Sequence, residues 1–105
     1  MKIFTHVMES SMAEQVDTEL RFVIASARAN GNELLHLKLD CEEDSKIALT
    51  LHKQLKTMKR EGKIDFFADK EAFSTQNAQA SYLINKFPKV TESIDSAIFF
   101  FIIKL

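Results

Sequence analysis

The stretch LLHLKLDCEEDS, at residues 34–45, decides the fold class because its character changes halfway along. Four of its first six residues are leucines, which indicates a buried strand. The acids that follow suit the positive N-terminal end of a helix, and either Asp40 or Ser45 can cap that helix. The stretch therefore predicts a strand that runs straight into a helix, as in α/β domains.

Helical spacing on both sides of this stretch extends the prediction. Before it, Ser11 and Glu14 match a capping box, and an apolar stripe indicates a helix that ends near Gly31. After it, a second stripe indicates a helix that ends at Gly62. The two stripes consist of Met12, Val16, Leu20, Val23, Ile24 and Ala27, and of Ile47, Leu51, Leu55 and Met58. A strand, a helix and a strand in this order imply parallel strands with a right-handed crossover.

The rest of the chain continues this alternation less regularly. Residues 2–8 and 64–68 are short, partly β-branched and aromatic, and indicate strands. A helix is expected from Phe73 onward, followed by a polar loop at 88–96. The expected buried positions of that helix are Ala78, Tyr82, Leu83 and Phe87. Residues 97–103 indicate a strand buried on both faces, which should be central or paired with a second copy of the chain.

This order of elements predicts one domain over residues 1–105. We expect a two-layer α/β fold whose four-stranded sheet is mixed and mostly parallel. Most of the nine phenylalanines are expected in its core, Phe22 and Phe66 among them, while Phe67 and Phe73 at element ends are the candidates for exposure.

Composition narrows the class of protein. The 14 basic and 15 acidic residues nearly balance, which argues against a general polyanion binder but permits a local basic face. Cys41 is the only cysteine, so an internal disulfide is excluded. The first residues do not resemble a signal peptide, and the longest apolar run, of about seven residues, is far shorter than the roughly 20 of a spanning helix. We therefore expect a cytoplasmic protein without a membrane partner.

Several short motifs along the chain resemble, in their order and spacing, the Smr (small MutS-related) domain family. The resemblance is greatest to a short, stand-alone branch found in bacteria. The motifs are MESSM at 8–12, LLH at 34–36, KI at 46–47, REGKIDFF at 60–67 and EAFS at 71–74. The resemblance implies a fold similar to the C-terminal domain of translation initiation factor 3. It also implies binding to DNA or RNA, which some members of the family nick.

Two hallmarks of that family are altered in this chain. The family's second strand runs into a histidine–glycine turn and a glycine-rich loop, whereas only His36 is kept here and residues 37–45 contain no glycine. The acids that replace the loop would repel phosphate. The family also has a leucine–aspartate–x–histidine signature in its first strand. The position of its histidine is occupied by Glu9 in this chain, and His6 does not replace that histidine. The resemblance, with these departures, predicts a nucleic-acid-binding domain that has lost nuclease activity.

His36 remains the one candidate catalytic residue. A histidine at a strand end can act as a general acid–base or bind phosphate. The alternative is a strand histidine that hydrogen-bonds to a neighbour. The other titratable residues match no metal-site spacing, because His6, His52, Cys41 and residues 42–44 fit neither a zinc pattern nor an EF-hand. We expect no metal site and no cofactor, and Cys41 has no identifiable base.

The second helix carries the best candidate binding surface. At 100° per residue, its basic residues fall opposite its apolar stripe. The candidate nucleic-acid-binding residues are Lys53, Lys56, Lys59, Arg60 and Lys63. Cations on one face can contact successive phosphates, although the same pattern is typical of a solvated helix face. Two alternatives stay open: a non-catalytic protein-interaction module or homodimer, and a retained nicking endonuclease that depends on His36.

Overall fold

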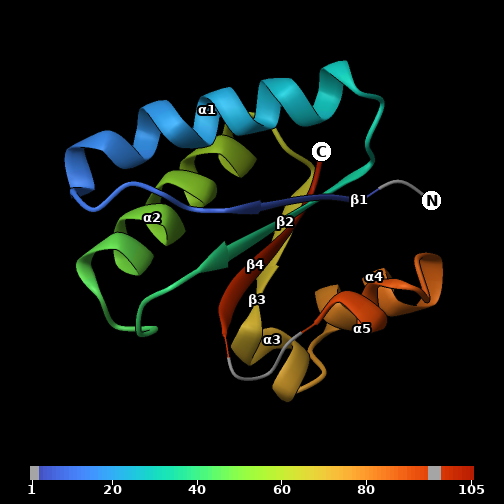
Figure 1. Cartoon of the computed structure of the whole chain (residues 1–105). Coiled ribbons are helices and arrows are strands. Elements are labelled where there is room, and N and C mark those ends of the chain that lie inside the picture. Colours follow the sequence, from blue (N-terminus) through green and yellow to red (C-terminus); the bar gives the residue numbers. More distant parts are fainter. Residues whose placement is uncertain (1–2, 95–97) are drawn as a thin grey trace.

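Four strands form one mixed sheet in the order β1-β2-β4-β3 (Figure 1). The structure is a computed structural model that describes residues 3–94 and 98–105. The strands are β1 Ile3–Val7, β2 Leu34–Leu39, β3 Phe66–Asp69 and β4 Phe99–Lys104. β1 and β2 are parallel, and β4 is antiparallel to both of its neighbours, β2 and β3. The predicted α/β class with a four-stranded mixed sheet is confirmed.

The last strand of the chain lies inside the sheet rather than at its edge. β4 separates β2 from β3, so the first three strands all run in one direction and β4 runs against them. Phe101, Ile102 and Ile103 have no exposed surface. The expectation that this apolar strand is central is confirmed, although its expected first residue, Ala97, lies outside the described residues.

The helices cover the two faces of the sheet unequally (Figure 1). The two long helices lie together on one face, and three short helices lie on the other. The helices are α1 Ala13–Ala29, α2 Lys46–Arg60, α3 Lys70–Ser74, α4 Ala78–Lys86 and α5 Val90–Ser93. Side chains of β2 alternate between two cores: Leu35, Leu37 and Leu39 pack with α1 and α2, whereas Leu34 packs with α3, α4 and α5. No helix of the described residues has the length and apolar content that crossing a bilayer requires.

Two predictions about helix starts have different outcomes. Ser45 caps α2, since its Oγ accepts a hydrogen bond from the Ala48 N–H at 3.1 Å. The prediction that Ser11 and Glu14 form a capping box is wrong, because Met12 is the N-cap of α1 and supplies no side-chain hydrogen bond. The reason is tertiary: Glu19, two turns into α1, binds the backbone just before Ser11 and fixes where the helix begins.

The helix expected from Phe73 onward is divided into α3 and α4. Gln76 between them has φ of 52°, and the Asn77 side chain accepts a hydrogen bond from the Ala80 N–H to begin α4. The new start changes which face of α4 is buried. Ala80 and Leu83 are buried, whereas Ala78 and Tyr82, expected in the core, are exposed.

Two further expectations are corrected. The polar loop expected at 88–96 contains α5, which is anchored by Val90 with no exposed surface. Phe22 is 71% exposed on α1 instead of buried, because it lies beside the apolar stripe of that helix rather than in it. Phe67 and Phe73 are both half-buried.

Candidate functional site

Three of the basic residues on α2 line one cleft. The apolar stripe of α2 is buried, which turns the opposite, charged arc of the helix outward. Lys56, and Lys59 and Arg60 one turn later, border a cleft of about 560 Å³ between α2, the edge strand β3 and the start of α4. Among residues 3–94 and 98–105, no ion pair involves any of these three cations. Their charge is therefore available to a ligand.

The floor of this basic cleft is aromatic. Phe67 on β3 and His52 on α2 meet edge to face, with ring centroids 5.5 Å apart. Both rings are half-buried, so part of each is accessible. Asn77 and Gln79 bring amide groups to the opposite wall from α4. The cleft thus combines three cations, aromatic rings and neutral hydrogen-bonding groups with one carboxylate, that of Asp69.

The two other basic candidates lie apart from the cleft. Lys53 is exposed on the outer side of α2 and does not border it. Lys63 follows the end of α2, where its Nζ lies 3.5 Å from Glu61 Oε1. The Lys63 carbonyl also accepts a hydrogen bond from the Arg28 side chain on α1. The structure therefore brings together three of the five predicted residues.

His36 lies in the core, far from solvent. It is 1% exposed, and its ring meets Phe100 edge to face at 5.5 Å on the sheet face that carries the short helices. Neither ring nitrogen has a hydrogen-bond partner among the described residues. Burial, with a smaller effect of the Lys38 charge, lowers the pKa of His36 from 6.5 to about 4. His36 is thus a neutral core side chain at pH 7, and it does not line the basic cleft.

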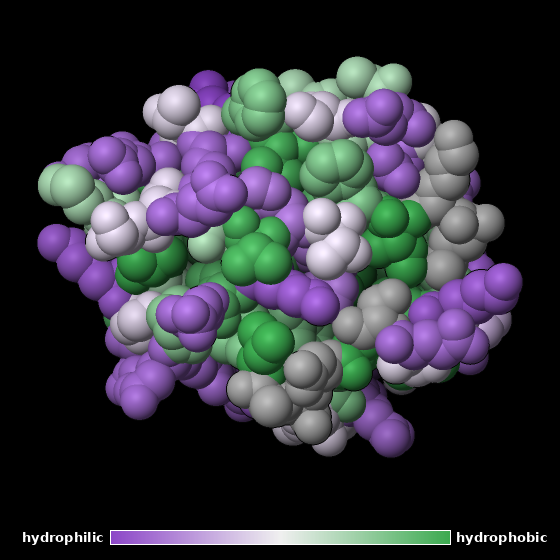
Figure 2. Space-filling model, viewed as in Figure 1, coloured by the Kyte–Doolittle hydropathy of each residue, from purple (hydrophilic) through white to green (hydrophobic). Residues whose placement is uncertain are grey.

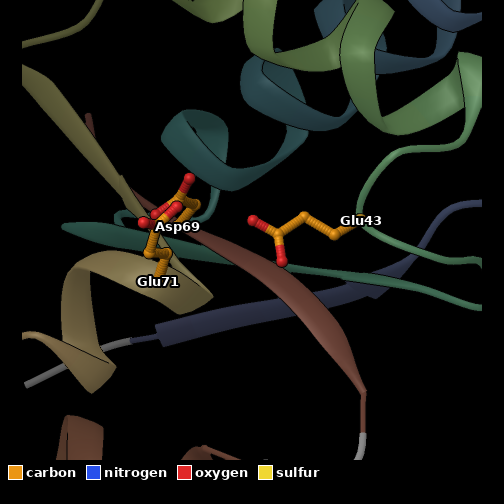
Figure 3. Close-up of side chains that lie close together, drawn as sticks. All are labelled: Glu43, Asp69 and Glu71. Carbon is orange, nitrogen blue, oxygen red and sulfur yellow. The ribbon is translucent and has the colours of Figure 1, made fainter.

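A group of carboxylates that sequence spacing does not reveal lies at the margin of the cleft, and one of its members, Asp69, borders the cleft (Figure 3). Oxygens of Glu43, Asp69 and Glu71 come within 4.8 Å of one another. Glu43 reaches from the loop before α2 toward the other two, which lie at the start of α3. Asp69 already accepts a hydrogen bond from the Ala72 N–H. Carboxylate oxygens are the ligands that Mg²⁺ and Ca²⁺ prefer, but exposed acids also gather without an ion.

The strand-to-helix turn after β1 is held by Glu19 on α1. Its carboxylate lies 2.7 Å from His6 Nε2 and accepts hydrogen bonds from the backbone N–H groups of Glu9 and Ser10, each at 2.8 Å. The Ser10 hydroxyl also donates to it. Partial burial alone would raise the pKa of Glu19, but these hydrogen bonds outweigh it and lower the pKa to about 2. Sequence spacing did not indicate this cluster, because its members are brought together only by packing.

Exposed apolar side chains are dispersed over the surface. Among the residues that the structure describes, the large ones are Val7, Met12, Phe22, Leu49 and Tyr82, which belong to four different elements and one turn. Figure 2 shows hydrophobic residues scattered among hydrophilic ones on one face of the molecule. A protein-docking surface usually gathers such side chains into one patch.

Comparisons of this chain with protein-family models, with curated proteins and with solved structures find no match. Functional inference therefore depends on the residues themselves.

Proposed function

We propose that this domain binds nucleic acid through the basic cleft between α2, β3 and α4, without cleaving it. The observation that carries the proposal is the position of Lys56, Lys59 and Arg60, which lie within about one turn of α2, border one cleft and form no ion pair with any described residue. A phosphodiester chain presents regularly spaced negative charges, which is what such a row of cations complements.

The other walls of the cleft favour nucleic acid over another polyanion. Inorganic polyphosphate, which has no rings or amides, would use the cations alone. The rings of Phe67 and His52 and the amides of Asn77 and Gln79 add stacking surfaces and hydrogen-bonding groups that nucleobases use.

Binding without cleavage is proposed because of where His36 lies. A histidine that transfers a proton to or from a phosphodiester must come within hydrogen-bonding distance of it. His36 is 1% exposed and packs on Phe100, away from the cations. A nuclease that depends on His36 would need the core to open. Nicking of a plasmid or an RNA by the wild-type protein, abolished in His36→Ala, would overturn this part of the proposal.

The test is a titration of the protein with short DNA and RNA strands at increasing salt, followed by fluorescence anisotropy. We expect binding at low salt that weakens steeply as salt rises, because each neutralised phosphate releases counterions. Lys56→Glu, Lys59→Glu and Arg60→Glu should each weaken binding, and the triple variant should abolish it.

The matched control is Lys46→Glu. Lys46 is an exposed cation on the same helix, about 15 Å from Lys56 by helix rise, and it does not border the cleft. The control makes the same change of charge and should leave binding nearly unchanged. Binding that is absent at low salt, or that survives in the triple variant, would refute the proposal. A dimer in a sizing experiment, together with no binding, would favour the interaction-module alternative.

A further inference from the structure

A second cleft continues the basic cleft around the open edge of the sheet. It measures about 400 Å³ and shares Lys59 and Gln79 with the first. Phe66 and Tyr82 form its apolar wall, with ring centroids 5.3 Å apart in an edge-to-face contact. The two clefts therefore meet at Lys59 and Gln79, and each has its own pair of aromatic rings.

The position of β3 at the edge of the sheet explains why the two aromatic pairs lie on opposite faces of the sheet. Within the described part of the chain, β3 pairs with β4 alone, so its other edge is open there. Successive strand residues point to opposite faces of a sheet. Phe67 points toward α2 and meets His52, while Phe66 points toward α4 and meets Tyr82. A ligand that follows the open edge of β3 would pass from one aromatic pair to the other.

Positive charge follows the same path. Lys56 and Arg60 border the first cleft, and Lys59 lies where the two meet. Lys86 lies beyond the second, with its Nζ 3.2 Å from Tyr82 Oη and 5.6 Å from the centre of the Tyr82 ring. The acid at the second cleft, Asp65, is opposed by Lys104, whose Nζ lies 3.6 Å away.

We infer that the two clefts bind consecutive nucleotides of a single strand, with one base against His52 and Phe67, the next against Tyr82 and Phe66, and the linking phosphate on Lys59. Each volume lies within the roughly 300–1,000 Å³ of small-ligand pockets. A duplex hides the faces of its bases in the stack, whereas a single strand presents them to aromatic side chains. This inference rests on the proposed function and adds the form of nucleic acid that is bound.

Two amide side chains give the site limited means of distinguishing bases. The Asn77 Oδ1 atom caps α4, which leaves its amide N–H₂ to donate. Gln79 borders both clefts, and its side chain makes no hydrogen bond within residues 3–94 and 98–105. Stacking dominates such sites and tolerates any base, so we expect modest sequence preference.

The experiment compares three strands of equal length: oligothymidine, oligouridine and an abasic strand that keeps the phosphates and lacks the bases. Tyr82→Ala should weaken binding of the first two by about five- to 150-fold, the range for loss of one stacked base. Tyr82→Ala should leave the affinity for the abasic strand unchanged. Tyr82→Phe keeps the ring and should bind like wild type. The oligothymidine and oligouridine arms show whether DNA or RNA is preferred.

A second measurement remains informative even if Tyr82→Ala fails to fold. Tyr82 is the only tyrosine, and the chain has no tryptophan. Its fluorescence in the wild-type protein therefore reports on the second cleft alone, and bases stacked there should quench it while an abasic strand should not. Equal binding of abasic and base-containing strands, with no quenching, would overturn this inference. If the triple variant of Lys56, Lys59 and Arg60 still abolished binding, the proposed function would stand. No binding of any strand would remove both.

Discussion

The Oε2 atom of Glu19 on α1 lies 2.7 Å from the Nε2 atom of His6 on β1. The same carboxylate accepts hydrogen bonds from Glu9 and Ser10, so one side chain joins the first strand, the turn and the first helix. A carboxylate that accepts several hydrogen bonds is stabilised in its charged form. This arrangement predicts how stability depends on acid.

Glu19→Gln should destabilise the fold at neutral pH. The pKa of Glu19 is about 2 in the folded chain against an ordinary 4.5, so its contribution is complete above pH 4.5 and is lost as pH falls toward 2. That shift corresponds to a free energy on the order of 3 kcal/mol. Chemical unfolding of the two proteins at pH 7 and pH 3 measures it. The difference in unfolding free energy between wild type and Glu19→Gln should be smaller at pH 3 than at pH 7. An equal difference at the two pH values would contradict the prediction.

His36 should make the fold sensitive to acid in a different interval. Its pKa is about 4 in the folded chain against 6.5 ordinarily, so the unfolded chain binds a proton first as pH falls. The contribution of the neutral histidine is complete above pH 6.5, is lost between 6.5 and 4, and does not change further below. His36→Leu should make the free energy of unfolding less dependent on pH over this interval. The variant should stay folded at pH 7, because the buried imidazole has no hydrogen-bond partner among the described residues and its loss therefore breaks no hydrogen bond seen there. An unchanged slope in His36→Leu would count against this account.

Ser45→Ala should cost about 1 kcal/mol of unfolding free energy, the usual value of an N-cap. Ser45 accepts the Ala48 N–H at the start of α2. Ser11→Ala is the matched control, since Ser11 is exposed and does not cap α1. Thermal or urea unfolding of both variants gives the comparison. Equal losses would mean that the helix starts are assigned incorrectly.

Two phenylalanines should respond oppositely to truncation. Phe101 has no exposed surface in the central strand β4, so Phe101→Ala should cost about 3–5 kcal/mol through lost burial and a cavity. Phe22 is 71% exposed on α1, and Phe22→Ala should change stability by no more than about 0.5 kcal/mol. A large loss in Phe22→Ala would indicate that its surface is covered in solution, as in a dimer.

Lys59→Ala should reduce nucleic-acid binding more than Lys53→Ala does. Lys59 borders both clefts, whereas Lys53 borders neither, although both occupy the basic arc of α2. If Lys59 contacts one phosphate of a single strand, its removal should lower the slope of log affinity against log salt by about 0.7. Equal slopes in the two variants would mean that binding uses the whole arc rather than the cleft.

The sequence by itself determined the α/β class, the two long helices and the burial of the last strand. These features depend on the helical spacing of apolar residues and on the uninterrupted apolar run at residues 97–103. Both can be read directly from the order of residues in the sequence. It also identified the cations of α2, because helical geometry places them opposite Leu51 and Leu55.

Tertiary structure alone decided which of those cations lie at the same cleft. The placement of β3 at the sheet edge, with α2 on one face and the start of α4 on the other, brings Lys56, Lys59 and Arg60 to aromatic rings and separates them from Lys53 and Lys63. It also placed His36 in the core, because β4 inserts between β2 and β3 and brings Phe100 against the imidazole ring. Contacts between residues distant in sequence depend on how strands pair and how helices pack. The spacing of residues along a single sequence specifies neither of these directly.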